Sequence, residues 1–300
     1  MASVGVLLVA MNGCSVRKYA VNKLGDALSQ TGAAFASDDD PDLIKDAAPF
    51  SLKLIESLLA ETPRHTGLLL AAASGFTQYA FAFVQQQADE LEASDLAAAE
   101  ALRARATRLY LRARNHGLRS LEVSHSGFEA ALRQNPKEAV RFARKSDVPS
   151  LYWTAASWGS AIALSKDNPE LVADVPLVEA MIDRALGLDE SHDRGAIHSF
   201  LISYEMSRAG GSGDPALRSR KHFERAWELS RGQEAAPLVA LAEAVTVQKQ
   251  DIKEFESLLK RALAIDPNAR PESRLVNLVV QRRARWLLSR KEELFLITSP

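Results

Sequence analysis

Three similar segments decide the fold: RALGLD (Arg184–Asp189), RAWELS (Arg225–Ser230) and RALAID (Arg261–Asp266). Each ends a stretch of amphipathic helical pattern, and the alanine at its second position recurs after 41 and then 36 residues. Such a period is typical of helical-hairpin repeats, in which a small side chain lets two helices approach closely. One hairpin cannot bury its apolar face alone, so repeats stack. We therefore predict an all-α protein of stacked antiparallel helical hairpins that form a tetratricopeptide-repeat-like superhelix with concave surfaces.

The helices around these segments follow from apolar periodicity and from helix-ending residues. We expect the first helices of the three hairpins at 149–165, 194–208 and 235–247, and a capping segment over 270–290. The connection Gln248–Gln250 is short enough to force antiparallel packing. No stretch of alternating β-branched residues between turn signals predicts a strand.

The chain before the repeats also has a helical pattern. A short helix is expected to open at Asp40-Pro41, and another to run over 49–59 with a proline in its first turn. Two long helices are expected over 68–91 and 96–115, and they would pack as an antiparallel hairpin. His116-Gly117 is the expected C-terminal stop of the second long helix, because glycine often follows a helix end.

These patterns divide the chain into five parts. They are a signal-peptide remnant (1–13), a tether with an N-terminal segment (14–37), N-terminal helical hairpins (38–148), tetratricopeptide-like repeats with a capping helix (149–290), and a C-terminal tail (291–300).

Composition excludes several classes of protein. With 47% hydrophobic and 25% charged residues, the 300-residue chain has the composition of a globular protein with a sizeable core, not that of a disordered or polytopic membrane protein. Its 37 basic and 38 acidic side chains give a net charge of −1, which argues against a nucleic-acid partner. Since there is a single cysteine, no intramolecular disulfide can form.

The N-terminus carries an export pattern. The apolar run Val4–Met11 is too short to span a bilayer but has the length of a signal-peptide core, and a glycine precedes Cys14. We expect Cys14 to be the lipid attachment site of a lipoprotein, with a frayed apolar strand and an incidental thiol as the alternative. Ser15 after the cysteine favours the outer membrane of a Gram-negative bacterium, with the protein facing the periplasm.

No constellation of residues predicts chemistry. Six histidines are scattered without the spacing of paired metal ligands or of a catalytic set. Ser160 lies in a helical pattern, not at the strand-to-helix turn of a serine hydrolase. We expect no catalytic residue, no metal ligand and no cofactor, and the protein is not expected to be an enzyme.

Three polar stretches have ordinary explanations. Gly210–Pro215 lacks the GK[ST] of a phosphate loop, so Asp214 is expected to cap a helix with Pro215 at its first position. Asp38–Asp42 lacks the central glycine and terminal glutamate of an EF-hand and is also expected to cap a helix. The arginines within 282–285, together with Arg290 and Lys291, are expected to form a solvated face near a helix C-terminus, with contact to anionic lipid as the alternative.

Aromatic residues are the best candidates for binding. Tyr152, Trp153 and Trp158 fall on one predicted helix, and tyrosine and tryptophan combine an apolar ring with a polar group. Stripes of this kind more often pack between helices, so core packing is the alternative for each of them.

With these segments in hand, the chain resembles the TRAP transporter T-component family of exported, lipoprotein-like helical-repeat proteins. The matching stretches, in this order and spacing, cover nearly the whole chain: Phe35–Pro41, Ala48–Lys53, Leu151–Gly159, Gly195–Leu201, Gly213–Pro215, Leu241–Ala244 and Gln281–Ala284.

The resemblance implies a non-enzymatic accessory of a TRAP-type uptake system. Such a protein would bind the periplasmic solute-binding protein and a small hydrophobic ligand in a cleft or pore, as a homo-oligomer expected to be a trimer. Tyr152, Trp153 and Trp158 would line this groove, and Tyr204 and Glu205, which follow the Gly195–Leu201 match, would add polar groups. A general outer-membrane scaffold for protein–protein interaction is the alternative function.

Overall fold

The computed structural model describes residues 22–28, 32–208 and 210–296, and all regular secondary structure within these ranges is helical. The all-α prediction is therefore confirmed. The expected signal-peptide remnant and Cys14 lie outside the described residues.

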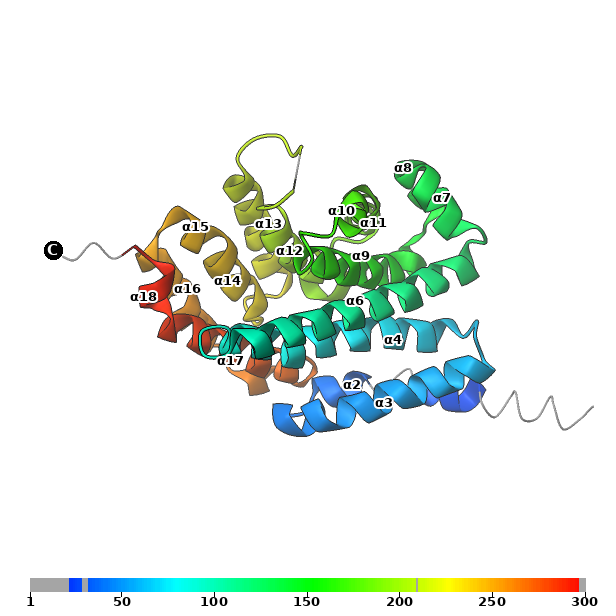
Figure 1. Cartoon of the computed structure of the whole chain (residues 1–300), viewed down its shortest axis with the longest axis horizontal. Helices are drawn as coiled ribbons and strands as arrows, with labels where there is room; N and C mark the ends of the chain where they lie inside the picture. Colours follow the sequence, from blue (N-terminus) through cyan, green and yellow to red (C-terminus); the bar gives the residue numbers. More distant parts are fainter. Residues whose placement is uncertain (1–21, 29–31, 209, 297–300) are drawn as a thin grey trace, which may run out of the picture.

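The N-terminal helices pack in layers. Helix α3 packs on α4, α4 packs on α6, and α6 packs on α9, so that these helices lie one above another (Figure 1). The bounds are α2 (Gly32–Ala36), α3 (Pro41–Glu61), α4 (Thr66–Tyr79), a π-helical segment η1 (Ala80–Gln85), α5 (Gln86–Leu91) and α6 (Leu96–Ser124).

Helix α3 corrects one prediction. Asp40 caps it through hydrogen bonds from the backbone N–H of Asp42 and Leu43, as expected. The helix then runs without interruption through Pro49, where the sequence predicted a second helix to begin. Proline removes one backbone donor inside the helix. The burial of one row of apolar side chains along the helix outweighs the loss of that hydrogen bond. The row consists of Ile44, Ala48, Leu52, Ile55 and Leu59.

The expected helix stop at His116-Gly117 is also wrong. Helix α6 continues to Ser124, and Gly117 lies buried inside it. A Cβ on Gly117 would collide with the Thr154 side chain of α9 and would lie 3.3 Å from the Thr154 Cα. The glycine therefore serves a close approach of two helices, not a helix end.

Three helical hairpins follow the layered part. In each hairpin the first helix packs on the second, and the second position of the three repeat segments, Ala185, Ala226 and Ala262, is fully buried. Short helices fill the connections: α7 (Phe128–Gln134), α8 (Pro136–Ala139) and α10 (Pro169–Ala173). The hairpins are α9 (Val148–Ala163) with α11 (Val175–Leu188), α12 (Ala196–Tyr204) with α13 (Pro215–Leu229), and α14 (Ala236–Leu241), π-helical η5 (Ala242–Thr246) and α15 (Val247–Lys249) with α16 (Ile252–Leu263).

These bounds agree with the predicted first helices to within a few residues. The last connection is shorter than expected, because α15 extends to Lys249 and Gln250 ends it in a left-handed conformation with φ of 57°. The capping segment is helix α17 (Arg274–Ser289), followed by α18 (Lys291–Leu294). The superhelix with concave surfaces stays a prediction.

Helix α17 returns to the N-terminal helices. Its Arg283 donates to Asp89 of α5 at 2.7 Å and also pairs with Glu243 of η5. Its Arg282 bonds both carboxylate oxygens of Glu90, at 2.8 and 3.2 Å. The Arg283 side chain is only 12% exposed, so the prediction of a solvated basic face is wrong at this residue. Segments nearly 200 residues apart are thus tied together.

One long apolar helix, Thr66–Leu91, has the length and composition to cross a membrane, with mean hydropathy of 1.4. Within the protein it buries one row of residues against α3 and α6, as the core helix of a globular domain does. That row includes Leu68, Leu69, Phe76 and Val84.

Candidate functional site

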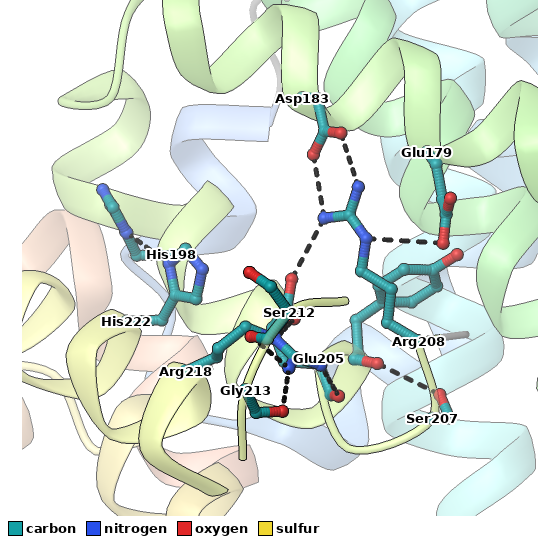
Figure 2. A network of polar contacts seen from close by, with 11 residues as sticks. Glu179, Asp183, His198, Glu205, Ser207, Arg208, Ser212, Gly213, Arg218 and His222 are labelled. Atoms are coloured by element: carbon teal, nitrogen blue, oxygen red, sulfur yellow. Dashed lines mark hydrogen bonds and ion pairs between the residues drawn. The ribbon is translucent and has the colours of Figure 1, made fainter. Parts of the chain in front are cut away.

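The two polar residues that the resemblance singled out, Tyr204 and Glu205, lie where α11, α12 and α13 meet. Figure 2 shows Glu205 at the centre of a network of charged side chains. We call this network the Glu205 cluster, and its members are Glu179, Asp183, Glu205, Arg208 and Arg218.

Local sequence explains how the cluster is positioned. Asp214 caps α13 by accepting from the backbone N–H of Ala216 at 2.8 Å, and Pro215 takes the first helical position, as predicted. At the start of α12, Gly195 has φ of 92°, and a Cβ there would lie 3.3 Å from the Cα of Ala226. Glycine therefore allows α12 and α13 to pack closely, which brings the end of α12 beside the start of α13.

Arg218 ties Glu205 to the glycine-rich loop before α13. Its Nε donates to Glu205 Oε2 at 2.5 Å, and its Nη1 donates to the carbonyl oxygens of Ser212 and Gly213 at 3.1 and 2.9 Å. One guanidinium thus fixes a carboxylate that is only 3% exposed and two loop carbonyls.

Arg208 ties the same carboxylate to α11. Its Nη1 donates to Glu205 Oε1 at 3.0 Å, and its two terminal nitrogens bond both oxygens of Asp183 at 3.0 and 2.5 Å. Its Nε lies 3.4 Å from Glu179 Oε1. The cluster therefore connects the second hairpin to the first.

The charges of the cluster stabilise contacts between helices. Burial raises the pKa of Glu205, but hydrogen bonds from Arg218 and Arg208 outweigh it and hold that pKa below the ordinary value. Burial, with the nearby charge of Asp183, raises the pKa of Glu179. Three carboxylates face two guanidiniums, so the cluster as a whole is acidic rather than a free anion-binding site.

Two histidines form a second polar contact between α12 and α13. His198 Nδ1 and His222 Nδ1 lie 2.8 Å apart (Figure 2). His198 Nε2 lies 3.3 Å from Glu190 Oε2. If His198 donates its Nε2 proton to Glu190, its Nδ1 must accept from His222. Burial lowers the pKa of both histidines, which favours this neutral pair.

The predicted aromatic residues gather in one core cluster. Tyr152 is 8% exposed and Trp158 is fully buried, whereas Trp153 and Tyr204 are partly buried at the edge of the same cluster. The rings of Tyr152 and Trp153 meet edge to face at 4.9 Å, and Tyr204 stacks on Phe200 at 5.5 Å.

Trp158 and Tyr204 differ in their surroundings. The guanidinium of Arg114 covers the Trp158 ring at 4.8 Å from its centroid. Burial raises the pKa of Tyr204, and the neighbouring charge of Glu179 adds to the effect. The role of the five predicted groove residues in binding stays a prediction.

Most contacts within the Glu205 cluster have no signal in the sequence. Glu179 and Asp183 are four residues apart and share one face of α11, and Glu205 and Arg208 are three apart, so only pairing within a helix had a local signal. The contact between His198 and His222 joins residues 24 apart, with no motif spacing to reveal it.

The Glu205 cluster and the histidine pair can form ion pairs and hydrogen bonds, within the protein or with a partner. Among the described residues, no group of three or more histidine, cysteine or acidic side chains could hold a metal ion. Beside the cluster, Met206, Asp214 and Pro215 form one side of an open pocket of about 300 Å³, and Gln248 and Lys249 form the other.

Comparison with known proteins places the chain in a family. A protein of Treponema pallidum (strain Nichols), described as an uncharacterized protein, is 28% identical over 95% of this chain and 94% of its own length. The sequence model of the TRAP transporter T-component family matches residues 37–295, which include nearly all the helices described above. The chain therefore belongs to the TRAP transporter T-component family.

Proposed function

We propose that this protein is the accessory component of a TRAP-type uptake system that binds the periplasmic solute-binding protein. The family match over residues 37–295 carries the proposal, because family membership indicates an accessory role in TRAP transport. The family is a transporter component and not a known enzyme.

The edge of the aromatic core supports a docking role. Trp153 and Tyr204 are partly buried there, and Tyr204 lies beside the acidic Glu205 cluster. Tyrosine and tryptophan are enriched at protein interfaces, because they combine a large apolar area with a polar group. We propose that this edge contacts the solute-binding protein and that a small hydrophobic ligand passes between the two proteins.

We further propose that the protein is a periplasmic lipoprotein, held at the outer membrane through Cys14, and that it assembles as a homo-oligomer with three subunits. The apolar run Val4–Met11 before Cys14 supports the anchor. The resemblance to the family supports the assembly.

Sedimentation of the full chain in mild detergent tests both binding and assembly. The chain is measured alone and mixed with the TRAP solute-binding protein encoded nearest to its gene. We expect an oligomer whose sedimentation coefficient rises on mixing. A sedimentation coefficient that does not change on mixing would contradict the proposal and favour a general helical-repeat scaffold.

Two tryptophan variants separate binding from folding. Trp153→Ala should weaken binding to the solute-binding protein with a modest loss of stability, because the side chain lies at the edge of the core. Trp158→Ala should instead lower the free energy of unfolding by about 3–5 kcal/mol, because the side chain is fully buried. If Trp153→Ala destabilises the protein as strongly as Trp158→Ala and leaves binding unchanged, Trp153 belongs to the core alone.

A further inference from the structure

An open pocket of about 330 Å³ lies where the C-terminal ends of α13 and α16 meet. Trp227, Ala264, Ile265 and Ala269 supply apolar surface, and Arg261 supplies a positive charge. This volume is at the lower end of the range for small-molecule sites, which are mostly apolar with a few placed polar groups. The pocket is therefore large enough for a small organic molecule.

The Trp227 ring has close neighbours at Phe223 and Gly232. It stacks on Phe223 with 6.3 Å between ring centroids and 19° between planes. Gly232 approaches the ring as well: it takes φ of 67°, and a Cβ there would lie 2.9 Å from the Trp227 ring. The N–H of Gly232 also donates to the carbonyl of Trp227 at 2.9 Å, which closes the turn after α13. The ring is thus a preformed apolar wall of the pocket.

Trp227 replaces a leucine of the repeat. The equivalent residue is Leu186 in the first repeat segment and Leu263 in the third. Only the second segment therefore places an indole at this position. The substitution of a larger aromatic residue gives the pocket a flat surface on which an apolar or aromatic group can stack.

The first residue of each repeat segment is an arginine, and its contacts differ from one segment to the next. Arg184 donates to the carbonyl oxygens of Arg141 and Ala143 at 3.0 and 2.7 Å. Arg225 bonds both oxygens of Glu190, at 2.5 and 3.0 Å. These two arginines are therefore engaged by groups within the protein.

Arg261 differs from both. It is exposed, and its guanidinium lies 5.1 Å from the centroid of the Trp227 ring. Among the described residues it has no hydrogen-bond acceptor and no carboxylate partner. Asp266, the one acidic residue of the lining, accepts from the backbone N–H of Asn268 at 2.9 Å and so caps the turn that follows α16. The donors of Arg261 therefore remain available at the pocket.

We propose that this pocket binds a small organic carboxylate that carries an aromatic or branched apolar group. The carboxylate pairs with the guanidinium of Arg261, whose planar donors match a carboxylate in two parallel hydrogen bonds. The apolar group lies against Trp227 and Ile265. The inference does not depend on binding of the solute-binding protein, since it rests on α13, α16 and the turns that follow them.

Isothermal titration calorimetry of the full chain tests this site with two probes, 3-phenylpropionate and its uncharged amide. The two molecules have nearly the same shape, so a difference in affinity reports the charge. We expect saturable binding of the carboxylate and binding of the amide that is weaker by about tenfold or more, because a charge-assisted pair is lost. Absence of saturable binding of 3-phenylpropionate at about 10 mM would overturn the proposal.

Three variants test whether the two probes bind in this pocket. Arg261→Gln should remove the preference for the carboxylate over the amide, whereas Arg285→Gln, which removes the same charge from an exposed position on α17, should keep it. Trp227→Leu, which restores the residue of the other two units, should weaken both probes to a similar extent. Melting temperatures measured in parallel should change little for Arg261→Gln, because its side chain makes no hydrogen bond and an exposed contact of a cation with an aromatic ring contributes only about 0.5–1 kcal/mol. An Arg261→Gln protein that still prefers the carboxylate would disprove the assignment.

Discussion

The hydrogen bond between His198 and His222 exists only while at least one of the two rings is neutral. Burial lowers the pKa of both histidines in the folded protein, and the like charge of His198 adds to the effect on His222. In the unfolded chain both would titrate near a pKa of about 6.5. As pH falls below that value, the unfolded state binds protons first, so the free energy of unfolding decreases, by at most about 1.4 kcal/mol per pH unit for each histidine.

Urea unfolding between about pH 7.5 and pH 5.5 measures this loss. The variant His222→Asn should show a smaller decrease over the same interval, because the asparagine amide can still donate to His198 Nδ1 but does not titrate. A variant with the same pH dependence as the wild type would show that His222 does not contribute to it.

Single residues also show how far the sequence could predict the site. The capping role of Asp214 and Pro215 was predictable, because a cap acts on the backbone two residues away. The contact of Arg218 with Glu205 and that of Arg208 with Asp183 were not, since each joins two segments whose packing must be known first.

Among the helices, the crossing of α6 and α9 depends on the missing side chain of Gly117. Gly117→Ala should lower the free energy of unfolding by about 1–3 kcal/mol, because the new methyl group meets Thr154 and the two helices must separate. This loss should appear even though alanine favours a helix over glycine by about 1 kcal/mol.

Gly187→Ala is the matched control for this prediction. Gly187 lies near the end of α11, and a Cβ there would have no neighbouring heavy atom within 4 Å. The same substitution should therefore leave stability unchanged or raise it by up to about 1 kcal/mol. Thermal and chemical unfolding compare the two variants, and equal effects would show that steric contact with Thr154 is not the cause.

Helices were predictable to the extent that local pattern determines them. The repeat segments gave helix ends at Leu188, Leu229 and Leu263, because apolar periodicity and turn residues act over a few positions. The pattern failed at Pro49 and Gly117, where a residue that usually ends a helix lies inside one. In both cases packing against another helix outweighs the local preference, and that packing has no signal in a single sequence.

For the molecule as a whole, the contact of Arg283 with Asp89 and Glu243 joins the last long helix to α5 of the N-terminal layers and to η5 of the third hairpin. Arg283→Gln should lower the free energy of unfolding by up to about 3 kcal/mol, because a largely buried Asp89 loses its nearer cation and keeps only Arg103, at 3.6 Å. Hydrogen exchange should then become faster in α17 and in α5 together, since the buried ion pair between them is lost.

Its neighbour on the same helix provides the control. Arg282 pairs with Glu90 through a side chain that is 52% exposed, so Arg282→Gln should cost less than about 1 kcal/mol. If the two variants have the same stability and the same exchange pattern, the tie through Arg283 does not link the two ends of the fold.

The return of α17 to the N-terminal helices also bears on how such a chain can evolve. Repeat arrays ordinarily lengthen by duplication of one unit, because each unit contacts only its neighbours. Here an inserted hairpin would move α17 one layer away from α5 and leave Asp89 inside the protein without Arg283. The first duplication of a hairpin would therefore destabilise the protein. We expect related chains to keep the same number of hairpins and to diverge by substitution.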